Sequence, residues 1–297
     1  MVAPPSQSSM CADSSVVVRS TFPAMGNTAM ITSIAHSRDI ASRALLVGTE
    51  RVQMLESSWS RFLPDSEVSK FNEGRQLNNF SADTQLLFEH MAQATARTGG
   101  LFDARILPEV LKIGYDSSLV DARRASGASQ SLAVDPGGIG KGLAADLAVS
   151  SMLEHGCTGA LVSVGGDIRC CGTPDRDNGW IIEVQSAHDE TIIGRVALDD
   201  GAIATSGFGA KRWACLGAHR THIVDPSTHA SIDSRQREVV QATVVASTAA
   251  WAEVYATACL VADMPAALAL LDRAGLAGLL QRHDGSTFAS INWSRYT

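Results

Sequence analysis

The sequence predicts an α+β fold with mixed, largely antiparallel sheets and flanking helices. One observation is size, because 297 residues, 45% of them hydrophobic and 19% charged, suffice for a substantial core. Another is that the period of the apolar residues changes repeatedly between that of a helix and that of a strand. A third is that short strands in the second half have turn residues between them, as in an antiparallel sheet.

Periodicity and turn residues place the elements of the N-terminal half. The expected order is a hairpin over 16–35, a helix over 40–57, a turn-rich segment over 59–74, a helix over 81–97 and an irregular stretch with one helical turn over 101–131. No change of composition marks a domain boundary. We therefore expect a disordered tail at 1–15 and a single domain at 16–297.

The second half is more regular. Its first part is predicted to be a β-loop-α-β unit, with a strand at 131–135, a glycine loop at 136–142, a helix at 143–155 and a strand at 160–164. The rest is predicted to contain short strands at 179–186, 194–198, 202–205, 222–225 and 239–246, helices at 248–261 and 265–273, and a hairpin around Asp284-Gly285.

Composition excludes several classes of protein. A net charge of −7 argues against nucleic-acid binding, which needs clustered Lys and Arg. The six cysteines show no CxxC spacing and are expected to be small core residues in a reducing compartment. The first twenty residues have no basic start followed by an apolar run, so we expect a cytoplasmic protein with no membrane span. Nothing in the sequence sets the oligomeric state.

The glycine loop VDPGGIGKGLAAD is the first candidate for chemistry. Glycines at a strand-to-helix junction let backbone N–H groups approach an anion, and the helix N-terminus favours negative charge. The loop is neither a Walker A sequence nor the dinucleotide fingerprint GxGxxG. It is equally explained as a tight helix-packing turn without a ligand, but Lys141 in its middle favours a phosphate.

A lone carboxylate marks the helix STAAWAEVYATACLVA. Glu253 is its only charged residue, and burying it is costly unless a cation or hydrogen-bond donor meets it. Thr257 lies one turn further on the same face. Hard oxygen donors of this kind suit Mg²⁺. The alternative is that Glu253 points into solvent.

Three further segments are weaker candidates. His222, in a predicted strand, has the pKa range of a general base, although a lone histidine is more often structural. Gly99-Gly100 and Gly165-Gly166 each precede a carboxylate, Asp103 and Asp167, where a large planar ligand could be clamped. Both glycine pairs are equally explained as plain turns.

Taken together, these segments resemble the ApbE family, the FAD:protein FMN transferases. The matching segments run in the family's order, as Ala24-Met25-Gly26-Asn27, Ser60 to Asn72, Gly100 to Asp103, Asp135 to Gly142, Val162 to Gly166, Ala204 to Gly207, His222 to Thr228 and Ala252 to Thr257. The resemblance implies the T-fold-like architecture of that family. It also implies an Mg²⁺-dependent enzyme that cleaves FAD, attaches FMN through a phosphoester to a Thr or Ser of an acceptor flavoprotein, and releases AMP.

The resemblance further implies site residues. The metal would be held by Glu253, Thr257 and the backbone carbonyl of Gly138, and Glu253 stands where the family usually has Asp. Contacts with FAD would come from Met25, Phe62, Leu101, Phe102, Asp103, Asp135, Lys141 and Val224. His222 is the candidate for the base or phosphate-positioning group, and Lys141 is the second candidate catalytic residue.

Three alternatives remain open from the sequence. An FAD pyrophosphatase giving FMN and AMP would use the same ligands, with water as the acceptor. A catalytically idle protein would bind FAD and leave it intact. A nicotinamide dehydrogenase is disfavoured, because the glycine fingerprint is wrong and hydride transfer does not need the Glu253 and Thr257 pair.

Overall fold

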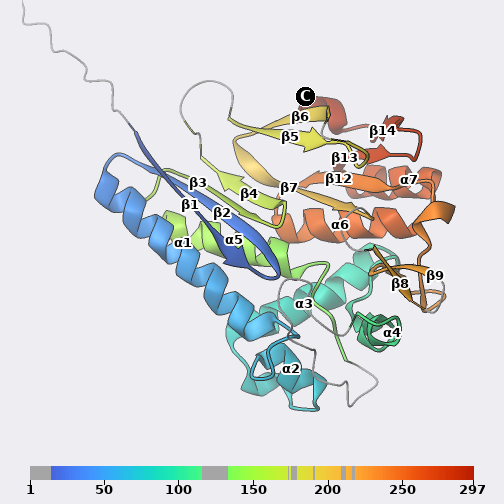
Figure 1. Cartoon of the computed structure of the whole chain (residues 1–297). Helices are drawn as coiled ribbons and strands as arrows, with labels where there is room; N and C mark the ends of the chain where they lie inside the picture. Colours follow the sequence, from blue (N-terminus) through green and yellow to red (C-terminus); the bar gives the residue numbers. More distant parts are fainter. Residues whose placement is uncertain are drawn as a thin grey trace, which may run out of the picture.

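The computed structural model describes residues 15–115, 133–172, 174, 179–189, 191–208, 212–215 and 218–297. An antiparallel sheet of eight strands runs through it, in the order β1-β2-β3-β4-β7-β12-β13-β14 (Figure 1). Its strands are β1 (Val16–Ala24), β2 (Asn27–Ala35), β3 (Gly159–Val164), β4 (Asp167–Cys171), β7 (Asp200–Gly207), β12 (Gln241–Ala246), β13 (Ala277–Gln281) and β14 (Thr287–Ala289). The predicted α+β class is confirmed. The tail expected at 1–15 lies, except for Ser15, outside the described residues.

Smaller pairs of strands and several helices surround this sheet. The pairs are β5 (Trp180–Gln185) with β6 (Ile192–Leu198), β8 (Arg212–Cys215) with β9 (Ala218–Thr221), and β10 (Val224–Asp225) with β11 (Ala230–Ser231). The helices are α1 (Arg38–Trp59), α2 (Glu67–Asn72), α3 (Ala82–Arg97), α4 (Leu107–Lys112), α5 (Gly140–Glu154), α6 (Ala249–Val261) and α7 (Met264–Ala274). Within the described part of the chain, no helix is both long and apolar enough to cross a bilayer.

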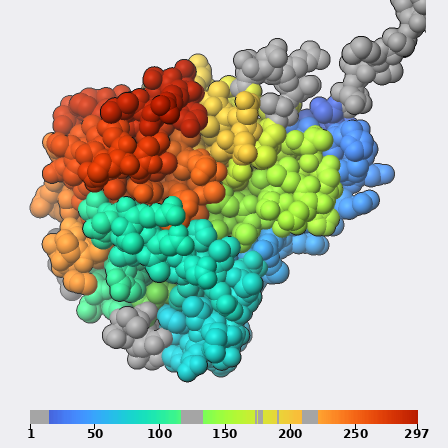
Figure 2. Space-filling view, turned by 180° about the vertical axis from the view of Figure 1, so that it is seen from behind, coloured from blue at the N-terminus to red at the C-terminus, as the bar shows by residue number. Residues whose placement is uncertain are grey.

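The two faces of the sheet are covered differently (Figure 1). Helices α1, α5 and α6 cover one face, where Ile31, Val52 and Val149 share a buried cluster. The β5–β6 hairpin covers the other face, where Trp180 and Leu279 are buried together. Helix α3 packs against the C-terminal half, as Figure 2 shows from behind with α2 and α3 in cyan beneath the orange and red segments. The core is thus continuous from the sheet to the N-terminal helices.

Residues 133–135, the described part of the strand predicted at 131–135, do not form a strand. The side chain of Asn72 donates to the Val134 carbonyl at 3.0 Å and accepts from the Val134 N–H at 2.8 Å. The Asp135 N–H donates to the Ala104 carbonyl at 2.8 Å. These partners satisfy the backbone groups that a sheet neighbour would otherwise take. The predicted β-loop-α-β unit is therefore wrong, and β3 pairs antiparallel with β2 and β4.

Other boundaries also differ from the prediction. Helix α5 begins at Gly140, so the glycine loop is shorter than expected. The turn-rich segment contains α2, which Ser66 caps by accepting the Ser69 N–H at 3.0 Å. His222 lies between β9 and β10 and not in a strand. The predicted β1–β2 hairpin, the long helices and the terminal hairpin are confirmed.

Candidate functional site

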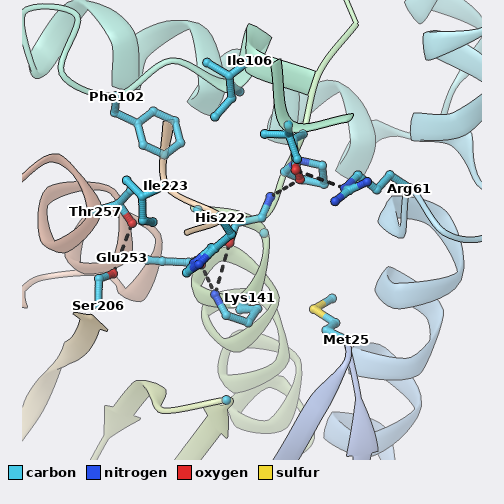
Figure 3. A pocket seen from close by; sticks show the side chains of 18 of the residues that line it. Met25, Arg61, Phe102, Ile106, Lys141, Ser206, His222, Ile223, Glu253 and Thr257 are labelled. Carbon is cyan, nitrogen blue, oxygen red and sulfur yellow. Dashed lines mark hydrogen bonds and ion pairs between the residues drawn. The ribbon is translucent and has the colours of Figure 1, made fainter. Parts of the chain in front are cut away.

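A cavity of about 330 Å³ opens where the N-terminal helices meet the sheet. Segments far apart in the sequence line it, so the cavity exists only in the folded chain. The structure brings every residue predicted for the site to this one cavity: Met25, Phe62, Leu101, Phe102, Asp103, Asp135, Gly138, Lys141, His222, Val224, Glu253 and Thr257. Figure 3 shows several of them, with Thr257 and Ser206 across the view from Arg61.

The β1–β2 turn brings Met25 to the cavity. Met25 has φ +50° and Gly26 has φ +67°, so both central residues of the two-residue turn are left-handed. That conformation is rare for a residue with a long side chain and costs on the order of 1 kcal/mol. The Gly165 N–H donates to the carbonyl of Thr28 at 3.0 Å and so joins the start of β2, next to this turn, to the β3–β4 turn. The hairpin is therefore fixed where its tip lines the cavity.

A buried cluster of charges forms the floor of the cavity. The Lys141 ammonium lies 2.7 Å from the Asp167 carboxylate and also forms an ion pair with Glu253. The second oxygen of Glu253 accepts the Gly142 N–H at 2.8 Å. Glu253 is 1% exposed and Asp167 is 2% exposed. The solvent-facing alternative for Glu253 is therefore wrong, and Lys141 is the cationic partner that its burial requires.

Burial shifts the titration of this cluster. Burial, the largest effect, and the neighbouring Asp167 carboxylate raise the pKa of Glu253, whereas the Lys141 ammonium and the Gly142 N–H favour its charged form. Burial lowers the pKa of Lys141, but the Asp167 and Glu253 carboxylates together raise it more. One ammonium thus faces two carboxylates, and the cluster has a deficit of positive charge.

Two hydroxyl groups and the glycine loop lie beside this cluster. The Thr257 hydroxyl is hydrogen-bonded to the Ser206 hydroxyl at 3.2 Å. Gly138 lies against both Phe102 and Thr257, since a Cβ atom there would come within 2.7 Å of the Phe102 ring and 3.6 Å of the Thr257 hydroxyl. Among the described residues, no three His, Cys, Asp or Glu side chains are grouped to hold a metal. Any cation here would therefore depend on hydroxyl and carbonyl oxygens as well as on Glu253.

This donor set fits Mg²⁺, the metal expected from the sequence. Carboxylate, hydroxyl and carbonyl oxygens are hard ligands, and Mg²⁺ prefers one or two carboxylates completed by other oxygens. Each oxygen of Glu253 has a second lone pair beyond the one used by Lys141 or Gly142. A divalent cation would also offset the excess negative charge of the buried cluster.

Arg61 forms a second charged centre, which the sequence reasoning missed. Its Nε lies 3.1 Å from the Asp135 carboxylate, and its Nη2 donates to the Tyr115 carbonyl at 3.0 Å. The guanidinium carbon lies 4.2 Å from the centre of the Phe62 ring. Arg61 is only 3% exposed. The signal that could have found it is its place between Ser60 and Phe62 in one of the family-like segments.

The remaining predicted residues have less specific settings. Asp103 accepts hydrogen bonds from Arg105, including one of 2.6 Å, and these with the positive charge of Arg105 hold its pKa below the usual value although burial raises it. Val224 is buried in β10. The rings of His222 and Tyr115 meet edge to face, with centroids 6.3 Å apart. Tyr115 is a further lining residue that the sequence analysis did not name.

Known proteins resemble this chain in sequence and fold. The model of the ApbE family matches residues 25–280. The FAD:protein FMN transferase of Vibrio cholerae is 26% identical over 268 residues, which cover 80% of this chain and 79% of the relative. The protein of the same name from Salmonella typhimurium is 25% identical over 283 residues, covering 84% and 80%.

Solved structures agree with the fold. The ApbE protein of Thermotoga maritima superposes with a TM-score of 0.80 at 22% identity, covering 95% of this chain and 99% of that one. The flavin transferase ApbE of Vibrio cholerae gives 0.78 at 22% identity, covering 96% and 100%. At this level of identity the likeness concerns the fold, and it confirms the architecture expected from the resemblance.

Proposed function

The chain belongs to the ApbE family, and from that premise we propose that it is an FAD:protein FMN transferase. It would cleave the pyrophosphate of FAD, attach FMN through a phosphoester to a Thr or Ser of an acceptor flavoprotein, and release AMP. The observation that carries the proposal is the buried cluster of Lys141, Asp167 and Glu253 on the floor of a cavity lined by the glycine loop. Two relatives that cover about 80% of the chain have that name.

The residues that would hold Mg²⁺ are Glu253, Thr257 and the backbone carbonyl of Gly138. When bound, the cation would offset the charge that builds on the pyrophosphate during phosphoryl transfer. The chain's own residues do the rest of the positioning. Lys141 would lie beside the phosphates at the start of α5, where the helix N-terminus favours negative charge.

The lining side chains would hold the two ring systems of FAD. Apolar contacts are available from Met25, Phe62, Leu101, Phe102 and Val224. Hydrogen-bond acceptors are available from Asp103 and Asp135. A cavity that combines apolar side chains with fixed polar groups is suited to a large planar ligand that carries phosphates.

His222 would take the proton of the incoming hydroxyl group. The acceptor oxygen forms a bond to the phosphorus of the FMN half, the bond from that phosphorus to the bridging oxygen breaks, and AMP leaves with that oxygen. The proton lost by the hydroxyl passes to the His222 ring, which lines the cavity. Water in place of the hydroxyl would make the same residues an FAD pyrophosphatase.

One assay tests this reaction against its alternatives. The protein is incubated with FAD, Mg²⁺ and a candidate flavin-carrier domain, and the carrier is weighed by mass spectrometry. A mass gain of one FMN on a Thr or Ser is expected. Free FMN with no gain on the carrier would instead indicate the pyrophosphatase, and intact FAD bound to the protein would indicate the idle binder. The cytoplasmic location expected from the sequence stays a prediction.

A further inference from the structure

We propose that Arg61 is the phosphate-recognising cation of the cavity, and that its Nη1 group donates to a phosphate oxygen of the substrate. This inference rests on the proposed binding of FAD. Neither the resemblance to the family nor the names of the relatives assign a role to this residue. It follows from the hydrogen bonds of the guanidinium and from the charges around the cavity.

One end of the buried Arg61 guanidinium lacks an acceptor in the described part of the chain. Its Nε is paired with Asp135 and its Nη2 with the Tyr115 carbonyl, but Nη1 has no hydrogen-bond partner among the described residues. The side chain is 3% exposed, so bulk water does not replace the missing partner. A buried N–H group without an acceptor is unfavourable, because nothing replaces the hydrogen bond that it made to water in the unfolded chain. A ligand that brings an oxygen to this point would remove that penalty.

The orientation of Arg61 is fixed by two aromatic rings and a carboxylate. Its guanidinium carbon lies 4.2 Å from the centre of the Phe62 ring and 4.8 Å from that of the Tyr115 ring. The ion pair with Asp135 holds it from a third direction. In Figure 3 the Arg61 side chain points from the segment that follows α1 toward the cavity. A fixed, planar donor of this kind loses little entropy when it binds an oxygen.

Arg61 is connected to the glycine loop through Asp135. Asp135 accepts from the Gly137 N–H at 2.9 Å, and the Gly137 carbonyl accepts from Lys141 at 3.4 Å. A single residue of the loop, Gly137, therefore lies between Lys141 and the Asp135 carboxylate that holds Arg61. A pyrophosphate at this loop would be within the region that the two cations flank.

Carboxylates outnumber cationic side chains in the described lining of the cavity. Lys141 and Arg61 are the only Lys or Arg side chains among the described residues that line the cavity, whereas its carboxylates are Glu56, Asp103, Asp135, Asp167 and Glu253. Lys141 is enclosed by two of these carboxylates. Arg61 is paired with one and still has an N–H to donate. Arg61 is therefore the cationic side chain that can still donate a hydrogen bond to a polyanionic substrate in this acidic cavity.

The test compares ligands with and without phosphate. Binding of FAD and of riboflavin is measured by flavin fluorescence with EDTA present, so that metal-dependent turnover does not interfere. Arg61→Gln should lower the affinity for FAD about 10- to 100-fold. It should lower the affinity for riboflavin less than about threefold. Arg51→Gln is the matched control, because Arg51 also pairs with a carboxylate, Asp83 at 2.7 Å, but does not line the cavity. It should leave both affinities unchanged.

Two results would overturn the proposal: an equal loss for FAD and riboflavin, or no loss for either. Because Arg61→Gln leaves Asp135 without its partner, a thermal melt must show that the variant folds. If Arg61→Gln does not fold, Arg61→Lys replaces it in the test, because it keeps the positive charge. Arg61→Lys must then lower the affinity for FAD more than the affinity for riboflavin. A further outcome is that the wild type binds FAD more tightly than Arg61→Gln does and yet transfers no FMN to the carrier. That result would contradict the transfer reaction and leave the role of Arg61 in binding intact.

Discussion

Gly142 of α5 lies directly against Ala249 at the start of α6. A Cβ atom on residue 142 would overlap the Ala249 carbonyl group and come within 2.7 Å of the Ala250 nitrogen. The same glycine donates its N–H to Glu253 at 2.8 Å. The close approach of two helices is therefore what brings the lone carboxylate of α6 to the charged cluster.

Gly142→Ala should destabilise the protein by about 1–3 kcal/mol, because the overlap is with backbone atoms that cannot move unless the helices separate. Gly140→Ala is the control in the same helix, since a Cβ there would lie 3.4 Å from Pro136, an ordinary contact. Its unfolding free energy should match or exceed that of the wild type. Urea unfolding measures both. Equal stability of the two variants would contradict the packing argument.

Sequence patterns predict local structure well in this chain. The period of the apolar residues locates α1 and α3, because a helix that buries one face has apolar residues at regular intervals. The β1–β2 turn is signalled by Gly26, which takes the left-handed conformation. Glu253 is the one charged residue of an apolar helix, and the prediction that it needs a cation or a hydrogen-bond donor is confirmed.

What sequence patterns do not supply is which distant residues meet. Lys141 and Glu253 are 112 positions apart, and no local periodicity encodes that pairing. The expected strand at 131–135 failed because the side chain of Asn72, 62 positions from Val134, takes the backbone hydrogen bonds of that segment. Arg61 was missed because its partner Asp135 is also distant in the sequence. The site was located mainly by resemblance, and its contacts needed the fold.

Glu253→Gln should abolish metal-dependent FMN transfer, with a loss of about 100-fold or more. The amide is nearly the same size but has no negative charge for a cation or for Lys141. The fold should persist, which circular dichroism and a thermal melt would check. FAD affinity in EDTA should change much less than turnover. Transfer at half the wild-type rate or better would remove Glu253 from the proposed metal site.

His222→Ala should lower the rate of transfer about 100- to 10,000-fold, the range lost when a general base is removed. FAD binding should weaken far less, because the ring is proposed to act on the acceptor hydroxyl. His229→Ala is the control, since His229 is an exposed histidine outside the cavity. Single-turnover kinetics separate the two effects. A variant that loses FAD affinity and rate in equal proportion would assign His222 to binding only.

Asp146 makes the stability of the protein depend on pH. Its carboxylate accepts the Ala249 N–H at 2.8 Å and the Ala250 N–H at 2.9 Å, and so caps α6 from α5. Burial raises its pKa to about 6, although the two amides and Arg169 lower it. The ordinary value is 3.8. The native state therefore holds a proton here between pH 4 and 6 that the unfolded chain has released.

Proton linkage determines whether the unfolding free energy rises or falls with pH. Stability decreases with rising pH wherever the native state binds more protons than the unfolded state. The contribution of Asp146 is complete below about pH 4 and is lost as the pH rises through 6. Asp146→Asn removes the titration and one of the two acceptors, and should cost about 1–3 kcal/mol. The difference in unfolding free energy between wild type and Asp146→Asn, measured by urea, should be about 1 kcal/mol smaller at pH 7.5 than at pH 5. A difference that is constant over this range would show that Asp146 titrates at its ordinary pKa and caps α6 as a carboxylate throughout.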